Sequence, residues 1–176
     1  MNKILLAAFL LAASTSVFGQ TKEEMESSKQ RIEKIQNLEA FNKTAIQSID
    51  DLQANIGSTA LESAAITPLL QNFYYRSIGQ NADGITDITV KKPTLAEVTE
   101  LSLRIYAQKK NLEQITSALA TASQDASATK NPLKLSKALS AVNYAKNAVA
   151  LLGEETVFQV NAIQSMIQTL STSGNL

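Results

Sequence analysis

Residues 98–122 carry an unbroken alternation of three- and four-residue apolar steps, which restricts this segment to a long helix that packs against other helices. The stripe consists of Val98, Leu101, Ile105, Gln108, Leu112, Ile115, Leu119 and Ala122. Side chains at these steps lie along one face of an α-helix, and several consecutive heptads are typical of coiled-coil packing. The flanking positions are mixed in charge, so we expect coiled-coil-like packing inside a bundle.

Two more stripes predict helices nearer the N-terminus. The first predicts one helix of about 35 residues that ends at Gly57, a natural helix stop. Its apolar positions are Ile32, Ile35, Leu38, Ala45, Ile49, Leu52 and Ile56. A shorter helix is expected from Leu61 to Phe73, with a kink at Pro68.

Helix starts are indicated by capping boxes, in which a threonine precedes a Glu or Gln by three residues. Three boxes are Thr21 with Glu24, Thr59 with Glu62, and Thr94 with Glu97; Asn131 before Pro132 is a further helix start. Residues 117–131 are rich in Ala, Ser and Thr, and we expect them to fray into a linker before Pro132.

The segment after Pro132 admits two interpretations. Its heptad frame continues past residue 153, which favours one long helix, although Lys146, Gly153 and Thr156 then occupy seam positions. Gly153 can also end a helix, and Thr156 with Gln159 forms a fourth capping box. Because two local signals agree, we favour a helical hairpin. The predicted fold is an all-α, elongated antiparallel bundle of four or five helices.

The first nineteen residues have the pattern of an export signal. Lys3 supplies a positive start, residues 4–13 are apolar, and Gly19 is a small residue at the expected cleavage point. The apolar run is about half the length that spans a bilayer. We therefore expect a cleaved signal peptide at 1–19, a single domain at 20–176, and a periplasmic or secreted protein, more typical of a bacterial envelope because the chain has no cysteine.

Composition excludes several functional classes. The chain has no histidine and no cysteine, and its 16 basic residues equal its 16 acidic ones. Histidine-dependent zinc sites, disulfides and a basic nucleic-acid surface are therefore absent, and we expect no metal, no cofactor, no nucleic-acid partner and no stable membrane insertion after cleavage.

Carboxylates alone can catalyse, and the adjacent pairs are Glu97 with Glu100, Asp50 with Asp51, and Glu154 with Glu155. Simpler roles as caps or solvated surface lead us to expect no enzyme and no catalytic residue.

The best candidate for a recognition site is an aromatic run followed by the irregular loop 77–93. Its residues are Phe73, Tyr74, Tyr75, Arg76, Lys91 and Lys92. Consecutive residues on a helix point in all directions, so at least one tyrosine should lie near the surface beside the cation, where it suits a partner protein or a polar small molecule. The simpler alternative is that the rings close the end of the bundle. Ile88 and Val90 are expected to form a brief extended piece of this loop.

Polar residues at three seam positions form a second candidate. They are Asn42, Gln108 and Lys146. A polar residue on an apolar seam fixes helix register at a cost in stability, or it lines a polar site inside the bundle, whereas Lys146 can simply reach water. On this interpretation, leucine at Asn42 or Gln108 raises the melting temperature.

Two functional hypotheses follow. The first is an exported, non-enzymatic bundle that binds another envelope or extracellular protein, or itself, through a helical face. The second is a small-ligand-binding protein with a site between helices or at the corner between Phe73 and Pro93.

Overall fold

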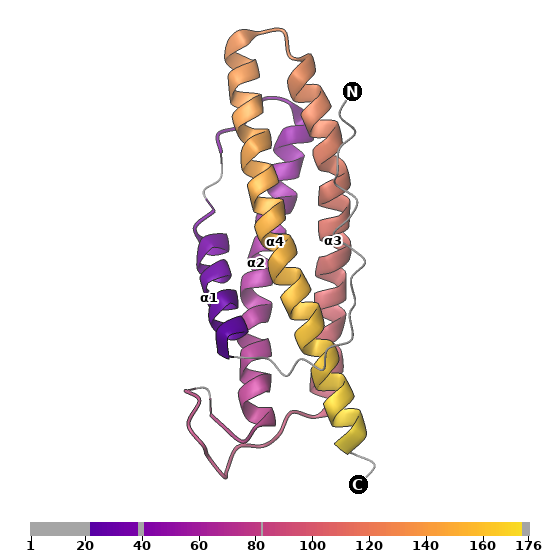
Figure 1. The fold of residues 1–176 in the computed structure, drawn as a ribbon. Helices are drawn as coiled ribbons and strands as arrows, with labels where there is room; N and C mark the ends of the chain where they lie inside the picture. The colour runs from indigo at the N-terminus through magenta and orange to yellow at the C-terminus, as the bar shows by residue number, and fades with distance from the viewer. Residues whose placement is uncertain (1–21, 39–40, 82, 174–176) are drawn as a thin grey trace.

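The computed structural model describes residues 22–38, 41–81 and 83–173, and it confirms the predicted all-α helical bundle (Figure 1). Within these residues it contains four helices: α1 (Lys22–Gln36), α2 (Gln47–Ser77), α3 (Leu95–Ala128) and α4 (Pro132–Ser173). The expected signal peptide at 1–19 and the capping residue Thr21 lie outside the described residues. Among the described helices, none is both long and apolar enough to cross a bilayer.

The three long helices form the body of the bundle, and α1 lies along one side of it (Figure 1). Helices α2, α3 and α4 run alternately up and down, and each contacts the other two. Helix α1 contacts α2 and α4 and covers only part of their length. The architecture is thus a three-helix body with a shorter helix seated against two of its members.

The prediction of one continuous N-terminal helix is wrong, because the chain leaves the helical path between α1 and α2. Ala45 has a φ of 58°, in the left-handed region that non-glycine residues seldom adopt. Thr44 stabilises this turn, since both its backbone N–H and its hydroxyl donate to Asp50. Leu38 and Phe41 still pack against the core from the non-helical segment, which explains why the apolar spacing looked continuous.

Helix α2 runs through both residues that were expected to interrupt or bend it. Gly57 and Pro68 lie inside the helix, so the predicted stop at Gly57 is wrong. Thr59 is buried within α2 and begins no new helix. Buried positions before and after Gly57 hold the segment in one helix, and this packing outweighs a glycine penalty of about 1 kcal/mol.

Helix α3 begins where its capping box predicts. The Thr94 hydroxyl accepts a hydrogen bond from the Glu97 N–H, and the Glu97 carboxylate accepts from the Thr94 N–H at 2.7 Å. The helix continues to Ala128, so the expected fraying into a linker from residue 117 is wrong. Asn131 caps α4 as predicted, because its side-chain oxygen accepts from the N–H groups of Leu133 and Lys134.

Helix α4 is one continuous helix from Pro132 to Ser173, so the favoured hairpin broken at Gly153 is wrong and the alternative of one long helix is right. Thr156 and Gln159, which resembled a capping box, are both buried inside this helix. A spacing of three residues also places two side chains on one helix face, and here that face points into the bundle.

The core divides into two clusters of buried apolar side chains. The first cluster is rich in alanine and unites α1 with the N-terminal part of α2, the C-terminal part of α3 and the N-terminal part of α4. The second cluster occupies the opposite end and is built from Ile66, Leu70, Val98, Leu101, Ile105, Ala162, Ile163 and Met166. On α2, α3 and α4, the buried positions between the two clusters are polar.

Candidate functional site

A layer of polar side chains separates the two apolar clusters, and we call it the polar layer. Its members are Ser28, Arg31, Ser63, Thr67, Gln108, Glu155, Thr156 and Gln159. All four described helices contribute to it, and all members except Arg31 are buried. Polar groups in such a place need hydrogen-bond partners, because an unpaired one loses its contacts with water at a cost of about 1–3 kcal/mol. Among the buried side-chain atoms of the layer, only Oε1 of Gln108 lacks a partner.

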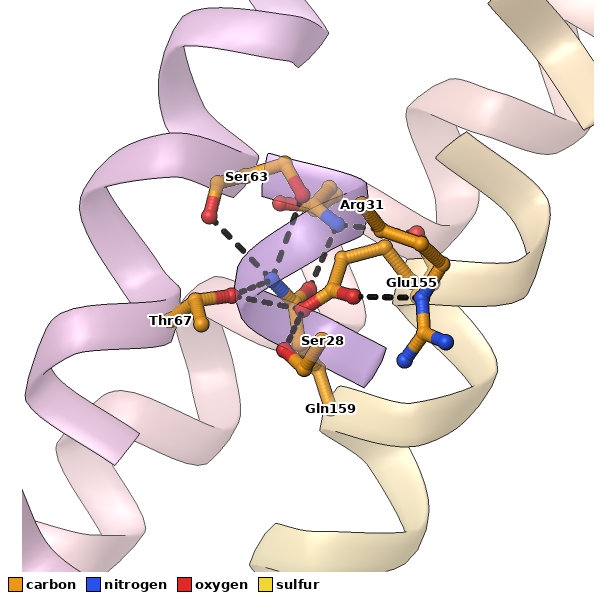
Figure 2. Close-up of polar contacts among 8 residues, drawn as sticks. Ser28, Arg31, Ser63, Thr67, Glu155 and Gln159 are labelled. Carbon is orange, nitrogen blue, oxygen red and sulfur yellow. Dashed lines mark hydrogen bonds and ion pairs between the residues drawn. The ribbon is translucent and has the colours of Figure 1, made fainter. Parts of the chain in front are cut away.

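Glu155 lies at the centre of the polar layer with no exposed side-chain surface. Its Oε1 accepts hydrogen bonds from the hydroxyls of Ser28 at 2.6 Å and Thr67 at 2.7 Å. Its Oε2 accepts from Nε of Arg31 at 2.8 Å, which makes an ion pair (Figure 2). The carboxylate therefore joins three helices: α1 through Ser28 and Arg31, α2 through Thr67, and its own α4.

Gln159 extends the layer from Glu155 toward α3. Its Nε2 donates to Thr67 Oγ1 at 2.9 Å and lies 3.2 Å from two oxygens of Ser63 (Figure 2). Its Oε1 accepts from Nε2 of Gln108 at 2.7 Å, and the same nitrogen donates to Thr156 at 2.8 Å. The network fixes the register of α2, α3 and α4, because a shift of any helix would break these bonds inside a region shielded from water.

A surface cleft of about 410 Å³ lies beside the polar layer, between α1 and α4. It is lined by Glu23, Glu24, Ser27, Arg31, Glu154, Val157, Phe158, Asn161 and Ala162. The guanidinium carbon of Arg31 lies 5.6 Å from the centre of the Phe158 ring, within the range of a cation–π contact. Arg31 thus connects the buried carboxylate to the surface, since its side chain keeps 18% of its surface exposed.

The predicted recognition residues at 73–76 lie together at the C-terminal end of α2. Phe73 and Tyr74 pack against the second cluster, and the rings of Tyr74 and Tyr75 meet edge to face at 5.7 Å. All four residues from Phe73 to Arg76 are half-buried, and Tyr75 also lies next to Gly84 of the following loop. The aromatic run therefore closes this end of the bundle, with its outer edges at the surface.

Arg76 ties the loop to the start of α3. Its guanidinium donates to Glu97 at 3.1 Å and to the carbonyls of Lys91 and Lys92, and it lies 5.5 Å from the Phe73 ring. Lys91 and Lys92 are exposed, and their backbone oxygens hold Arg76 in place. The structure thus brings Arg76 and the lysines together through the backbone, while the lysine side chains reach solvent.

Glu97 is the clearest electrostatic anomaly at this corner. Its pKa is lowered from 4.5 to about 2, first by the hydrogen bond from the Thr94 backbone and then by the hydrogen bonds from Arg76 and the Thr94 hydroxyl. The charged form accepts all of these bonds, so they favour ionisation. The carboxylate is committed to capping α3 and holding Arg76.

The three predicted seam residues separate in the structure. Gln108 is buried at the centre of the layer, as its place in the stripe implies. Asn42 is exposed in the non-helical segment before α2, which corrects its expected seam position. Lys146 is exposed on α4, in agreement with the alternative that it reaches water.

Sequence patterns did not single out Ser28, Arg31, Ser63 or Thr67, and they placed Glu155 at a helix start. The sequence nevertheless contains a signal for the polar layer. Ser63 interrupts the buried stripe of α2, and Glu155, Thr156 and Gln159 interrupt the stripe of α4 between Leu152 and Ile163. Polar residues that interrupt apolar stripes at matching heights of several helices predict a shared buried network once the helices are known to be continuous.

Asp50 and Asp51, another of the predicted carboxylate pairs, both accept hydrogen bonds within the chain. Asp50 lies in the first turn of α2, where its carboxylate accepts hydrogen bonds from the Thr44 N–H and hydroxyl. Asp51 accepts from the Gln47 amide at 2.6 Å. Among the described residues, no group of three or more side chains is arranged to hold a metal ion.

The fold and the polar layer together define an all-α helical bundle with an internal polar network. No family model matches the chain, and neither the curated proteins nor the solved structures contain a significantly similar one.

Proposed function

We propose that this protein is an exported, non-enzymatic helical bundle that acts by binding another protein of the bacterial envelope or extracellular space. The apolar signal-like segment at residues 1–19 supports export. The polar side chains described above support a binding role in preference to catalysis. Both oxygens of Glu155 are occupied by donors, and Glu97 caps a helix.

The observation that carries this proposal is a group of exposed aliphatic side chains in the connection between α2 and α3, which we call the corner loop (residues 78–81 and 83–94). Ile85 is 62% exposed and Ile88 is 99% exposed, and Ile78 is exposed at the start of the loop. Large aliphatic side chains gathered in one surface segment are typical of protein interaction sites.

The corner loop is held in a defined shape by hydrogen bonds. Gln80 and Thr86 form an isolated antiparallel bridge, and the Asn81 side chain accepts from the N–H groups of Asp83 and Ile85. This bridge, with Ile88 in a turn, replaces the extended piece expected at Ile88 and Val90. Arg76 secures the far end of the loop. A surface that is already ordered loses little conformational entropy on binding, which favours affinity.

Photocrosslinking in intact cells tests the proposal. A photoreactive amino acid at Ile88 should capture a specific protein, whereas the same residue at Leu103, exposed on α3, should not. The captured protein is identified by mass spectrometry, and N-terminal sequencing of the chain should find Gln20 first. A chain that stays in the cytoplasm, or equal capture from both positions, would refute the proposal.

A matched pair of variants separates loss of binding from loss of fold. Ile85→Ser with Ile88→Ser should abolish capture from a photoreactive residue at Leu95, which is also exposed, without changing the melting temperature. Leu61→Ser with Leu103→Ser removes comparable exposed apolar surface from the helices and should leave capture unchanged.

The cleft between α1 and α4 favours a second candidate function, binding of a small ligand. Its volume of about 410 Å³ lies in the range of ligand pockets, and it presents a guanidinium beside an aromatic ring. A strictly monomeric chain that captures no protein at the corner loop, but carries a small molecule through purification, would support this alternative.

A further inference from the structure

The cleft between α1 and α4 exists while α1 is packed in its place on the bundle. Its volume is about 410 Å³, and its lining residues recur at steps of three or four on both helices, so each helix presents one continuous face to it. The cleft is thus a fixed feature of the fold, and the side chains on its two faces indicate which ligand suits it.

Arg31 presents an oriented guanidinium to this cleft. Its Nε donates to Glu155 at 2.8 Å, and its guanidinium carbon lies 5.6 Å from the centre of the Phe158 ring. Both terminal nitrogens turn away from Glu155 (Figure 2), and among the described residues neither has a hydrogen-bond acceptor. The planar fork that these nitrogens form matches the two oxygens of a carboxylate, and Glu155 and Phe158 hold it in position.

Acidic side chains surround this cation. Glu23 and Glu24 line the cleft from α1 and Glu154 lines it from α4, whereas the guanidinium of Arg31 is already paired with Glu155. This balance of charge repels a ligand that is only negative, such as phosphate. A carboxylate can therefore bind Arg31 here when the same ligand also brings a positive charge to the acidic side chains.

The two kinds of charge are separated along α1. Glu24 lies seven residues before Arg31, which is about 10 Å along the helix axis at 1.5 Å per residue. A hydrogen bond of about 3 Å at each end leaves about 4–5 Å between the charged groups of the ligand. A single amino acid carries both charges on one carbon and falls short, whereas a further residue adds about 3.5 Å.

The cleft also contains apolar surface and neutral hydrogen-bonding groups. Val157 is 56% exposed although it lines the cleft, and Phe158 is half-buried beside it. An apolar side chain placed on these two residues would remove their surface from water. Ser27 and Asn161 also line the cleft, and their polar groups suit the amide of a peptide bond.

From these observations we infer that the cleft between α1 and α4 binds a short zwitterionic peptide of dipeptide size. Its carboxylate pairs with the terminal nitrogens of Arg31, its amino group lies at Glu23 and Glu24, and an apolar side chain packs on Val157 and Phe158. The inference rests on the second candidate function, binding of a small ligand at this cleft, and names the class of ligand. It is independent of the corner loop.

Isothermal titration calorimetry on the purified full chain tests the inference with three probes. Leucyl-leucine carries both charges, N-acetyl-leucyl-leucine carries only the negative charge, and leucyl-leucinamide carries only the positive one. Leucyl-leucine should bind, and each of the other two should bind at least about tenfold more weakly because it lacks one set of charge-assisted hydrogen bonds. No binding of leucyl-leucine, or equal binding of a singly charged probe, would overturn the inference.

Substitutions at the acidic end should separate the probes. Glu23→Gln with Glu24→Gln should weaken binding of leucyl-leucine about tenfold and leave N-acetyl-leucyl-leucine unchanged or bound more tightly. Glu26→Gln with Glu33→Gln is the matched control, since it removes the same charges from exposed positions of α1 outside the cleft lining. Equal effects of the two double substitutions would show that only the overall charge matters, and they would overturn the inference.

Arg31→Lys tests the other end of the cleft. Lysine keeps a cation for Glu155 but loses the planar fork, so both probes with a free carboxylate should bind more weakly while leucyl-leucinamide is unaffected. An equal loss for all three probes would contradict the role of Arg31. Circular dichroism checks the fold, and the glutamate variants, which alter exposed or half-buried side chains, decide the question without this variant.

Methyl chemical shifts locate the bound peptide. Leucyl-leucine should shift the methyl signals of Val157 and leave those of Leu61 and Leu103, which are exposed outside the cleft. Shifts that spare Val157 would overturn the inference. A chain that binds no probe but releases another small molecule on denaturation would overturn the peptide and leave the second candidate function standing, while capture from Ile88 reports on the corner loop alone.

Discussion

Two arginine–glutamate pairs in this protein have the same chemistry and different surroundings. Arg31 meets Glu155 at 2.8 Å, and Arg76 meets Glu97 at 3.1 Å. The Glu155 side chain has no exposed surface, whereas that of Glu97 is 40% exposed. Glu97 also takes its capping bonds from a residue three positions away, while the partners of Glu155 are 88, 124 and 127 positions away. The first pair joins α1 to α4, and the second joins the end of α2 to the capped start of α3, 21 positions further along the chain.

The comparison shows that burial, more than hydrogen-bond length, decides what such a pair contributes. At the surface, water substitutes for either partner, so an exposed pair contributes about 0–1 kcal/mol. In the interior nothing substitutes, and loss of one partner leaves the other unpaired. The two pairs should therefore respond very differently to the same substitution.

The largest expected effect comes from removing the buried carboxylate. Glu155→Ala should lower the free energy of unfolding by about 3–5 kcal/mol, because Arg31, Ser28 and Thr67 all lose their acceptor and a cavity remains. Glu97→Ala should cost about 1 kcal/mol, the usual value of a lost helix cap. Denaturant titrations followed by circular dichroism measure both.

Glu154→Ala is the matched control for Glu155→Ala, since it removes the same group from an exposed neighbouring position. It should change stability by less than about 0.5 kcal/mol. Equal losses for Glu155→Ala and Glu97→Ala would contradict the assigned difference between the two pairs.

A smaller loss is expected inside the same layer, at Gln108. The stripe alone predicts that leucine here raises the melting temperature, but the structure reverses that expectation. Gln108→Leu removes the donor to Thr156 and Gln159, so the buried Oε1 of Gln159 loses its hydrogen bond. We expect a loss of about 1–3 kcal/mol. The loss is limited because Oε1 of Gln108 is itself buried and unpaired. A higher melting temperature would show that the layer costs more than it contributes.

The contribution of the exposed Arg76–Glu97 pair to stability should depend on pH. The pKa of Glu97 in the folded chain is about 2, below its ordinary value of 4.5. Its charged form is therefore favoured by folding, and this contribution is fully present above pH 4.5 and is lost as the pH falls toward 2. The stability difference between wild type and Glu97→Gln should accordingly shrink over this interval. Because the side chain is 40% exposed, the difference is small and decreases with added salt.

Thr94→Ala provides the control for this pH dependence, because Thr94 supplies the cap that lowers the pKa of Glu97. Its backbone bond survives the substitution while its hydroxyl bond does not, so the pH dependence should weaken without vanishing. A pH profile identical in wild type and Glu97→Gln would contradict the role assigned to Glu97.

The two pairs also separate what the sequence could predict from what it could not. Thr94 with Glu97 and Asn131 with Pro132 were identified correctly because a cap depends on residues within one turn. The apolar stripes placed most of the core, including Leu101, Ile105 and Leu112, because a helix repeats its geometry regularly. Local signals failed where the role of a residue depends on contacts with other helices of the bundle. Thr156 and Gln159 have the spacing of a cap, but their role depends on Gln108, which is 48 and 51 positions away.

The smallest expected effect tests the continuity of α4 at the point where the sequence favoured a break. Gly153 lies inside the helix, and a Cβ added there would meet nothing within 4 Å. Gly153→Ala should therefore stabilise the chain by about 0.5–1 kcal/mol, because alanine restricts the unfolded chain and suits a helix interior. Gly57→Ala in α2 is equally free of contacts and should behave alike. A loss of stability in Gly153→Ala alone would indicate a bend at this position. Because Glu155 lies two residues after Gly153, such a bend would also change the direction from which Glu155 meets Ser28 and Arg31.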